Sequence, residues 1–260
     1  MKRVVSRIIG RNTGQDRDAP AIPPPQPEET FVAVGDLHGC PDLLCRLGLM
    51  IEQQHFGSPI VFLGDYVDRG EDTRGVLELL MGSSPEGSQP VTCLMGNHEL
   101  LLLDFLDDPA RGARSWLRNG GLQTLASFGV APPAGGMDNR PALEALRDRL
   151  AAAMGDRMID WLRDRPLTWR NGNVWAVHAG ADPIKPMEAQ DPEVLLWGHS
   201  RFHRQPRQDG QWVVHGHSVV PAPEMRDTRI AVDTGAYATG VLSAAVISKE
   251  DVRFLQAGNG

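Results

Sequence analysis

Short apolar runs alternate with polar turns along most of the chain. Continuous apolar runs that are rich in β-branched residues are typical of buried strands, and they occupy residues 31–36, 59–65, 91–97 and 173–180. Residues 41–54 and 74–81 lie between the first three runs and repeat their apolar positions at helical spacing. This alternation predicts an α/β fold in which helices cover a sheet of buried strands.

The pattern changes along the second half of the chain. Helical spacing continues after Asn97, over residues 113–129 and through a charged run at 140–164. Beyond His178 the apolar runs are short and punctuated by Gly and Pro, which is typical of strands; they lie at residues 212–217, 229–235 and 241–248. We therefore expect the part of the chain after His178 to be rich in strands and to contain no long helix.

The N-terminal 30 residues have a different character. Residues 1–11 are basic, but Arg7 interrupts their apolar part, so they do not fit a signal peptide; a small amphipathic patch for a membrane or a partner is the alternative. Residues 17–30 are rich in proline, which predicts an extended linker without fixed contacts. We expect a flexible leader over residues 1–30 and one folded domain over residues 31–260.

Composition narrows the class of protein. The chain has 260 residues, of which 41% are hydrophobic and 23% charged, as in ordinary globular proteins. A net charge of -7 with a pI near 5.6 argues against a nucleic-acid-binding protein. No apolar run reaches the length of a membrane span. The number of cysteines is odd, and none of them forms a CxxC pair: they are Cys40, Cys45 and Cys93. This indicates reduced thiols and a cytoplasmic location.

Polar side chains that can bind metals follow five of the predicted strands. The residues at these ends are Asp36 and His38, then Asp65, Asp68 and Arg69, then Asn97, His98 and Glu99, then His178, and last His217. In open α/β sheets, ligands bind at the carboxyl edge of the strands. Oxygen and imidazole ligands without a thiolate suit manganese, iron or zinc.

Each of these residues also has an ordinary structural explanation. A single Asp after a strand commonly caps the next helix, and a single His in an apolar run is commonly a core residue. Four of the eight histidines fall at these strand ends, however, in the company of carboxylates. This coincidence favours a shared metal site over separate structural roles.

The motifs GDLHG, GDYVDRG, GNHE, HAG and GH occur in this order between residues 31 and 248. They resemble the calcineurin-like metallophosphoesterases, and among these the phosphoprotein phosphatase branch in its bacterial serine/threonine phosphatase form. The resemblance implies a layered β-sandwich flanked by helices, with two divalent metal ions at the strand edge. Manganese is the expected ion, with iron or zinc as alternatives. The implied metal ligands are Asp36, His38, Asp65, Asn97, His178 and His217.

The resemblance also implies a reaction. A hydroxide that bridges the metals would attack phosphorus directly, and His98 would protonate the leaving oxygen as general acid. Asp68 would orient His98, Arg69 would grip the phosphoryl oxygens, and Glu99 would brace the loop. The expected substrate is a phosphoprotein or phosphopeptide, and residues 31–260 would form the catalytic domain.

Several positions depart from the family pattern. His199 stands where bacterial members usually carry a second phosphate-binding arginine, and Arg201 is the candidate replacement. The segment at 116–121, WLRNGG, resembles a bacterial variant that shapes the substrate rim. Tyr237 has two alternatives, to lean over the cleft or simply to pack against its neighbours, and packing is the expectation.

Three other functions fit parts of the sequence. A diadenosine tetraphosphate hydrolase of the same superfamily shares GDLHGC and HAG. An aspartic protease would use Asp233 within IAVDTGA, but a second such loop is absent from the sequence. A non-catalytic binding module would keep the fold alone, although the full set of expected ligands and the Asp68–His98 pair argue against it.

Overall fold

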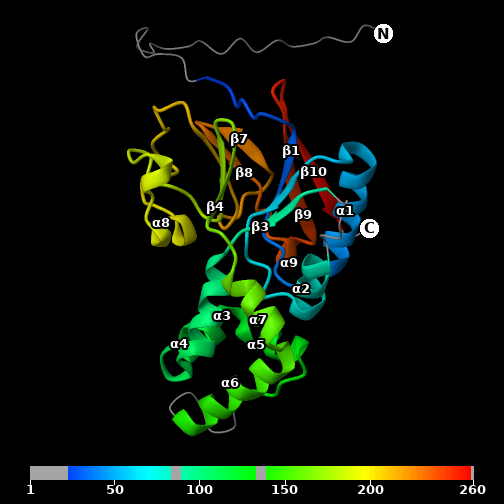
Figure 1. The fold of residues 1–260 in the computed structure, drawn as a ribbon, viewed down its shortest axis with the longest axis vertical. Coiled ribbons are helices and arrows are strands. Elements are labelled where there is room, and N and C mark those ends of the chain that lie inside the picture. Colours follow the sequence, from blue (N-terminus) through cyan, green and yellow to red (C-terminus); the bar gives the residue numbers. More distant parts are fainter. Residues whose placement is uncertain (1–22, 83–88, 133–138, 259–260) are drawn as a thin grey trace, which may run out of the picture.

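The computed structural model describes residues 23–82, 89–132 and 139–258. Two five-stranded sheets pack face to face, and a helical lobe extends from one end of them (Figure 1). This arrangement confirms the predicted α/β fold with a layered sandwich flanked by helices.

The first sheet has the strand order β10-β9-β1-β2-β3. Strands β1 and β2 are parallel, as are β2 and β3, whereas β9 runs antiparallel to β1 and β10. Its strands are β1 (Phe31–Val34), β2 (Ile60–Phe62), β3 (Val91–Cys93), β9 (Val241–Ile247) and β10 (Val252–Gly258). Because three neighbouring strands are parallel, their polar C-terminal loops reach one edge together.

The second sheet has the order β4-β5-β6-β8-β7. Here β5, β6 and β8 are parallel, and the outer strands β4 and β7 are antiparallel to their neighbours. Its strands are β4 (Thr168–Asn171), β5 (Val174–Val177), β6 (Trp212–His215), β7 (Glu224–Arg226) and β8 (Arg229–Ala231). The strand-rich second half is thereby confirmed.

Alternation along β1 explains why its sequence is apolar throughout. Phe31 and Ala33 join the core between the two sheets, while Val32 and Val34 join the core on the helical side. All four are buried. A strand covered on both faces has no position left for a polar side chain, so the run ends only where the chain leaves the sheet.

Helices cover the outer face of the first sheet and build the lobe (Figure 1). On α1, Leu43, Leu47 and Ile51 are buried at intervals of four residues, and the helix packs on β9 and β10. The helices are α1 (Pro41–His55), α2 (Thr73–Gly82), α3 (Asn97–Asp107), α4 (Pro109–Trp116), α5 (Leu122–Ser127), α6 (Arg140–Met154), α7 (Asp156–Arg163), α8 (Pro192–Trp197) and α9 (Ala236–Thr239), with a 3₁₀ turn at Met187–Ala189.

Two of the predicted helical stretches are interrupted. Gly155 has a φ of +76° and separates α6 from α7. Between α4 and α5, a π-helical turn at Leu117–Gly121 contains non-helical backbone at Asn119 and Gly120. Such π segments occur frequently at functional sites. This one brings the WLRNGG segment against the loop that follows β2.

The end of the predicted leader is not free of contacts. Asn173 Oδ1 accepts a hydrogen bond of 2.5 Å from the Gln26 N–H, and Asn171 Oδ1 accepts one of 2.6 Å from the Glu28 N–H. Trp212 Nε1–H donates to the Pro23 carbonyl at 2.8 Å. The expectation of no fixed contacts is therefore wrong for residues 23–30, and residues 1–22 lie outside the described part. Within the described residues, no helix is long and apolar enough to cross a membrane.

Candidate active site

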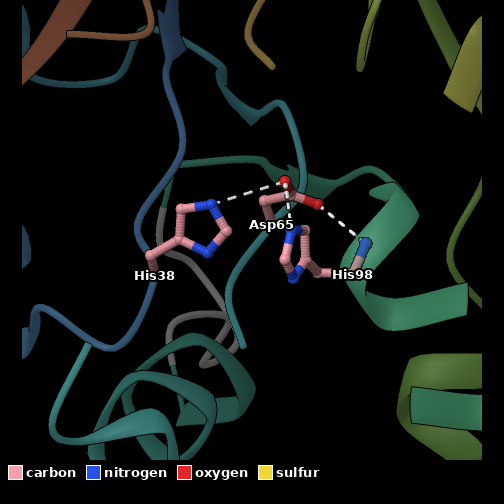
Figure 2. A group of neighbouring side chains, drawn as sticks. All are labelled: His38, Asp65 and His98. Carbon is pink, nitrogen blue, oxygen red and sulfur yellow. Dashed lines mark hydrogen bonds and ion pairs between the residues drawn. The ribbon is translucent and has the colours of Figure 1, made fainter. Parts of the chain in front are cut away.

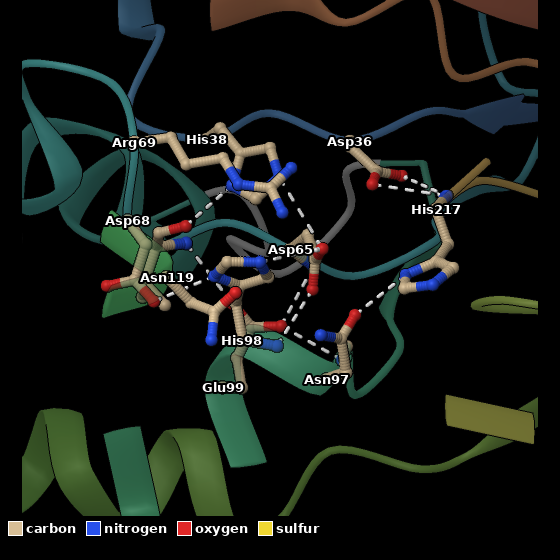
Figure 3. A network of polar contacts seen from close by, with 12 residues as sticks. Asp36, His38, Asp65, Asp68, Arg69, Asn97, His98, Glu99, Asn119 and His217 are labelled. Atoms are coloured by element: carbon tan, nitrogen blue, oxygen red, sulfur yellow. Dashed lines mark hydrogen bonds and ion pairs between the residues drawn. The ribbon is translucent and has the colours of Figure 1, made fainter. Parts of the chain in front are cut away.

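The strand-end residues converge at one edge of the sandwich. The loops after β1, β2 and β3 of the first sheet meet those after β5 and β6 of the second (Figure 3). Five of the six predicted metal ligands are buried, and His217 is half-buried. The structure thus brings together Asp36, His38, Asp65, Asn97, His178 and His217.

Asp65 lies at the centre of the cluster. Its carboxylate is 3.3 Å from His178 Nε2, 3.5 Å from His38 Nε2 and 3.9 Å from His98 Nε2 (Figure 2). Burial opposes ionisation of Asp65, but the imidazoles of His178, His98 and His38 outweigh it and hold the pKa of this carboxyl below its usual range. A central ionised carboxylate is what two neighbouring cations need as a shared ligand.

Backbone carbonyls fix the orientation of two imidazoles. His38 Nδ1–H donates to the Val67 carbonyl and His178 Nδ1–H to the Leu63 carbonyl, each at 2.8 Å. The Nε2 lone pairs therefore face Asp65, as in metal-binding histidines held by second partners. Burial lowers the pKa of His38 to about 3 and lowers that of His178 as well, so both are neutral ligands near pH 7.

Asn97 follows β3 of the first sheet and contacts two histidines that follow strands of the second sheet. Its Oδ1 lies 2.8 Å from His178 Nε2 and 2.8 Å from His217 Nδ1. Burial lowers the pKa of His217 to about 4, so this imidazole is also neutral. An amide oxygen and two neutral imidazoles beside Asp65 form a donor set suited to a borderline divalent ion.

Asp36 lies beside His217 and near two other carboxylates, those of Asp233 and Asp65. Its two oxygens accept hydrogen bonds of 3.0 and 3.1 Å from the His217 N–H. Burial and the nearby Asp233 and Asp65 carboxylates raise its pKa well above the usual value. Gly216 allows this close approach, since a Cβ there would lie 2.0 Å from Asp36 Oδ1. Asp233 was predicted only as the nucleophile of an aspartic protease. The structure instead places its carboxylate near that of Asp36.

The residues fit a pair of divalent cations. Two groups offer ligand atoms within 4.8 Å of one another: His38, Asp65 and His98 in one, and Asp65, His178 and His217 in the other. Asp65 belongs to both groups. Buried carboxylates that raise one another's pKa are relieved by a bound cation. The assignment of individual ligands to each ion stays a prediction.

His98 and Asp68 form a buried pair beside the metal-ligand cluster. His98 Nδ1–H donates to Asp68 Oδ2 at 2.8 Å, and His98 Nε2 is buried without a hydrogen-bond partner among the described residues. Burial alone would lower the pKa of His98, but Asp65 and the hydrogen bond with Asp68 raise it above its ordinary value. An imidazole that retains its proton next to a reaction centre is suited to general acid catalysis.

Asp68 is itself held by three side chains. Trp116 Nε1–H and Thr124 Oγ1–H donate to Asp68 Oδ1 at 2.9 and 2.7 Å, while Thr73 and Thr124 hydroxyls accept from the Asp68 N–H at 3.2 and 3.0 Å. The WLRNGG motif was expected to shape a rim, but Trp116 is fully buried and positions Asp68. No motif marks Thr73 or Thr124, and neither was predicted from the sequence.

Arg69 is presented by a strained loop. Asp68 and Arg69 have φ values of +70° and +66°, and the Arg69 N–H donates to the Gly120 carbonyl at 3.3 Å. Arg69 Nη1 lies 3.2 Å from His38 Nε2, so the guanidinium faces the cluster. The next residue must be Gly70, because a Cβ there would lie 1.8 Å from the His38 carbonyl oxygen.

Glu99 braces the loop, as predicted. Its carboxylate accepts backbone N–H groups of Asp65, Tyr66 and Gly96 at 2.8, 2.8 and 2.9 Å. A further bond comes from the Val67 N–H at 3.2 Å. Asn97 and His98 therefore face the site, while Glu99 fixes the backbone that carries Asp65.

Arg201 and Tyr237 were both considered at the rim of the site. The role of Arg201 in binding phosphate stays a prediction. Arg201 is exposed, and across the described ranges its side chain makes no hydrogen bond or ion pair with the cluster; its backbone N–H meets His199 Nδ1. Tyr237 was expected to pack and not to lean over the cleft, and this is wrong. The residue is 41% exposed, and its ring stands edge-on to that of His38, with centroids 5.2 Å apart.

The chain belongs to the calcineurin-like phosphoesterase family, whose model matches residues 29–231. This result fits the site, because members of a phosphoesterase family act on phosphate esters and the cluster offers the ligands for two cations. The broader part of the predicted identity, a metallophosphoesterase enzyme, is thereby confirmed.

Several curated relatives are bis(5'-nucleosyl)-tetraphosphatases, and not the serine/threonine phosphatases that were expected. The symmetrical bis(5'-nucleosyl)-tetraphosphatase of Methylococcus capsulatus is 30% identical over 58% of this chain and 43% of its own length. That of Aeromonas hydrophila is 31% identical over 70% of this chain and 54% of its own length. The chain thus matches about half the length of these relatives. The asymmetrical bis(5'-nucleosyl)-tetraphosphatase PrpE of Bacillus subtilis is 26% identical over 78% of this chain and 84% of its own length.

Solved structures support the fold alone. A cold-active protein-tyrosine phosphatase of a psychrophilic Shewanella species superposes with a TM-score of 0.55 at 15% identity, over 88% of this chain and 80% of its own. A protein serine/threonine phosphatase of Saccharomyces cerevisiae gives 0.54 at 16% identity, over 90% and 81%. At these identities the shared architecture does not distinguish between substrates.

Proposed function

We propose that this protein is a metal-dependent hydrolase of dinucleoside tetraphosphates. The names of the curated relatives support this substrate better than the phosphoserine or phosphothreonine protein that was the first expectation. The observation that carries the hydrolytic part is the buried Asp68–His98 pair, whose free Nε2 faces a cluster of carboxylates and neutral imidazoles.

The chemistry assigns a role to each group. The six ligand residues would hold two divalent cations, which would supply positive charge for the phosphoryl oxygens and for activation of water. Arg69 adds a planar pair of donors on the same oxygens. A bond forms between the attacking water oxygen and phosphorus, and the bond from phosphorus to the leaving oxygen breaks. His98 Nε2 donates its proton to that oxygen, and Asp68 stabilises the imidazolium beforehand.

Manganese is the proposed ion, since oxygen and imidazole ligands without thiolate suit it, and iron or zinc are the alternatives. A cytoplasmic location stays a proposal that rests on the unpaired thiols of Cys40, Cys45 and Cys93.

The test is a product analysis with two substrates at equal concentration. Manganese-loaded protein receives diadenosine tetraphosphate in one reaction and a phosphoserine/phosphothreonine peptide in the other, with a metal-stripped sample and Asp65→Asn as controls. We expect metal-dependent cleavage of the dinucleotide in preference to the peptide. Two adenosine diphosphates would indicate symmetrical cleavage, and adenosine triphosphate with adenosine monophosphate asymmetrical cleavage. Release of phosphate from the peptide that is faster than cleavage of the dinucleotide would overturn the proposal and would favour a protein phosphatase.

A further inference from the structure

Two exposed aromatic side chains lie beside the metal-ligand cluster, and each contacts a histidine of a different ligand group. Tyr237, on α9, is 41% exposed and meets His38 edge-on at 5.2 Å between ring centroids. Trp197, at the end of α8, is 44% exposed and meets His217 edge-on at 6.4 Å. His38 and His217 belong to different ligand groups, so one aromatic ring stands beside each half of the site.

The ring of Tyr237 also lines a cavity of about 680 Å³. Arg69 forms the side of this cavity next to the cluster, and its guanidinium carbon lies 5.2 Å from the centroid of the Tyr237 ring. Asp42, Glu71 and Asp72 also line this cavity. Acidic side chains disfavour a phosphate chain but accept hydrogen bonds from ribose hydroxyls, as in nucleotide-binding folds. The cavity therefore suits an uncharged nucleoside attached to a phosphate held at Arg69.

We infer that Tyr237 and Trp197 each stack one nucleobase of a dinucleoside tetraphosphate, one on either side of the phosphate chain. This inference rests on the proposed function and extends it from the reacting phosphate to both ends of the substrate. Stacking on an aromatic ring is tolerant of base identity, because every base has a π-face. A substrate with a base at each end uses both aromatic rings, whereas a phosphopeptide carries no base that could stack on the second ring.

The test compares substrates with and without bases. The variants are Tyr237→Leu and Trp197→Leu, with Tyr237→Phe and Trp197→Phe as matched controls that keep an aromatic face. For each, kcat/KM is measured with diadenosine tetraphosphate and with inorganic tetraphosphate, and the ratio of the two is the readout. A disturbance passed on to His38, Arg69 or His217 affects both substrates and cancels in this ratio. Loss of one stacked base should lower the ratio by about 5- to 150-fold, and the Phe variants should keep it within about twofold.

A second measurement uses products as inhibitors. Each Leu variant should weaken inhibition by adenosine diphosphate more than inhibition by pyrophosphate, because only the former carries a base. Unchanged ratios in both measurements, with wild-type hydrolysis of the dinucleotide intact, would overturn the stacking inference while leaving the proposed function in place. If the wild-type protein cleaves the phosphopeptide and not the dinucleotide, both are overturned together.

Discussion

Replacement of Asp68 by Asn changes one atom of a fully buried group and tests how the general acid is held. The carboxylate accepts on one oxygen from Trp116 and Thr124 and on the other from His98 Nδ1–H. All of these partners are donors. An amide can keep its oxygen toward Trp116 and Thr124, but its NH₂ group then faces His98 Nδ1 and forces the other tautomer. The imidazolium also loses its ionised partner.

The size of the effect depends on the leaving group. General acid catalysis contributes about 10²–10⁴ in rate where the leaving oxygen needs a proton. Phenyl phosphate needs one more than 4-nitrophenyl phosphate, whose product is a stabilised anion. We expect Asp68→Asn to lower kcat for phenyl phosphate by about 10²–10⁴ and for 4-nitrophenyl phosphate by less than about tenfold. Steady-state kinetics on both esters with manganese present provides the measurement.

The variant His98→Asn is the matched comparison. It removes the acid itself, so the same leaving-group pattern is expected, and the double variant should lose little more than either single one because the two residues act as a unit. A thermal melt checks that Asp68→Asn remains folded. Equal losses on both esters, or losses that multiply in the double variant, would refute the general-acid assignment.

Four other predictions follow from the same structure. Trp116→Phe keeps the ring stacked on Phe105 but removes a bond to a buried carboxylate, so kcat should fall about tenfold or more with KM unchanged in steady-state assays. The pKa of His98 is raised and its protonated form is the active one, so turnover of phenyl phosphate should decline as pH rises through that pKa, and His98→Asn should abolish this limb. Chelation should abolish hydrolysis and lower Tm, since Asp36, Asp65 and Asp233 then repel one another; calorimetry with and without manganese measures this. Asn171→Ala removes two bonds to residues 28 and 29 and should cost about 1–3 kcal/mol, seen as a lower denaturant midpoint at unchanged m-value.

The sequence was most informative where chemistry and backbone conformation coincide. Asp65 lies in the loop after β2 and His98 in the first turn of α3 after β3, and parallel strands carry such residues to one edge, so their convergence could be predicted. The residue pattern alone could not predict that the second sheet packs on the first, because Val174 and Ala176 show only that a strand is buried and not what covers it. The layered sandwich was implied only by the family resemblance.

The support of Asp68 escaped prediction for a different reason. Trp116 and Thr124 lie 48 and 56 residues beyond it in the chain, on either side of the π-helical turn. A buried Trp and a buried Thr in helical segments look like ordinary core residues, and only the three-dimensional arrangement shows that both donate to one carboxylate. Tyr237 is similar: its exposure depends on the short α9 helix, whose four residues give no periodic signal.

The hydrogen bonds of residues 23–29 have a practical consequence for the orientation of the molecule. Asn173 precedes β5 and Trp212 begins β6, so the segment that contacts them lies at the amino ends of strands whose carboxyl ends carry His178 and His217. Strands of four residues separate the two ends by about 13 Å. A surface, a resin or a fused protein coupled ahead of Pro23 would therefore hold the enzyme from behind, with the mouth of the site facing outward.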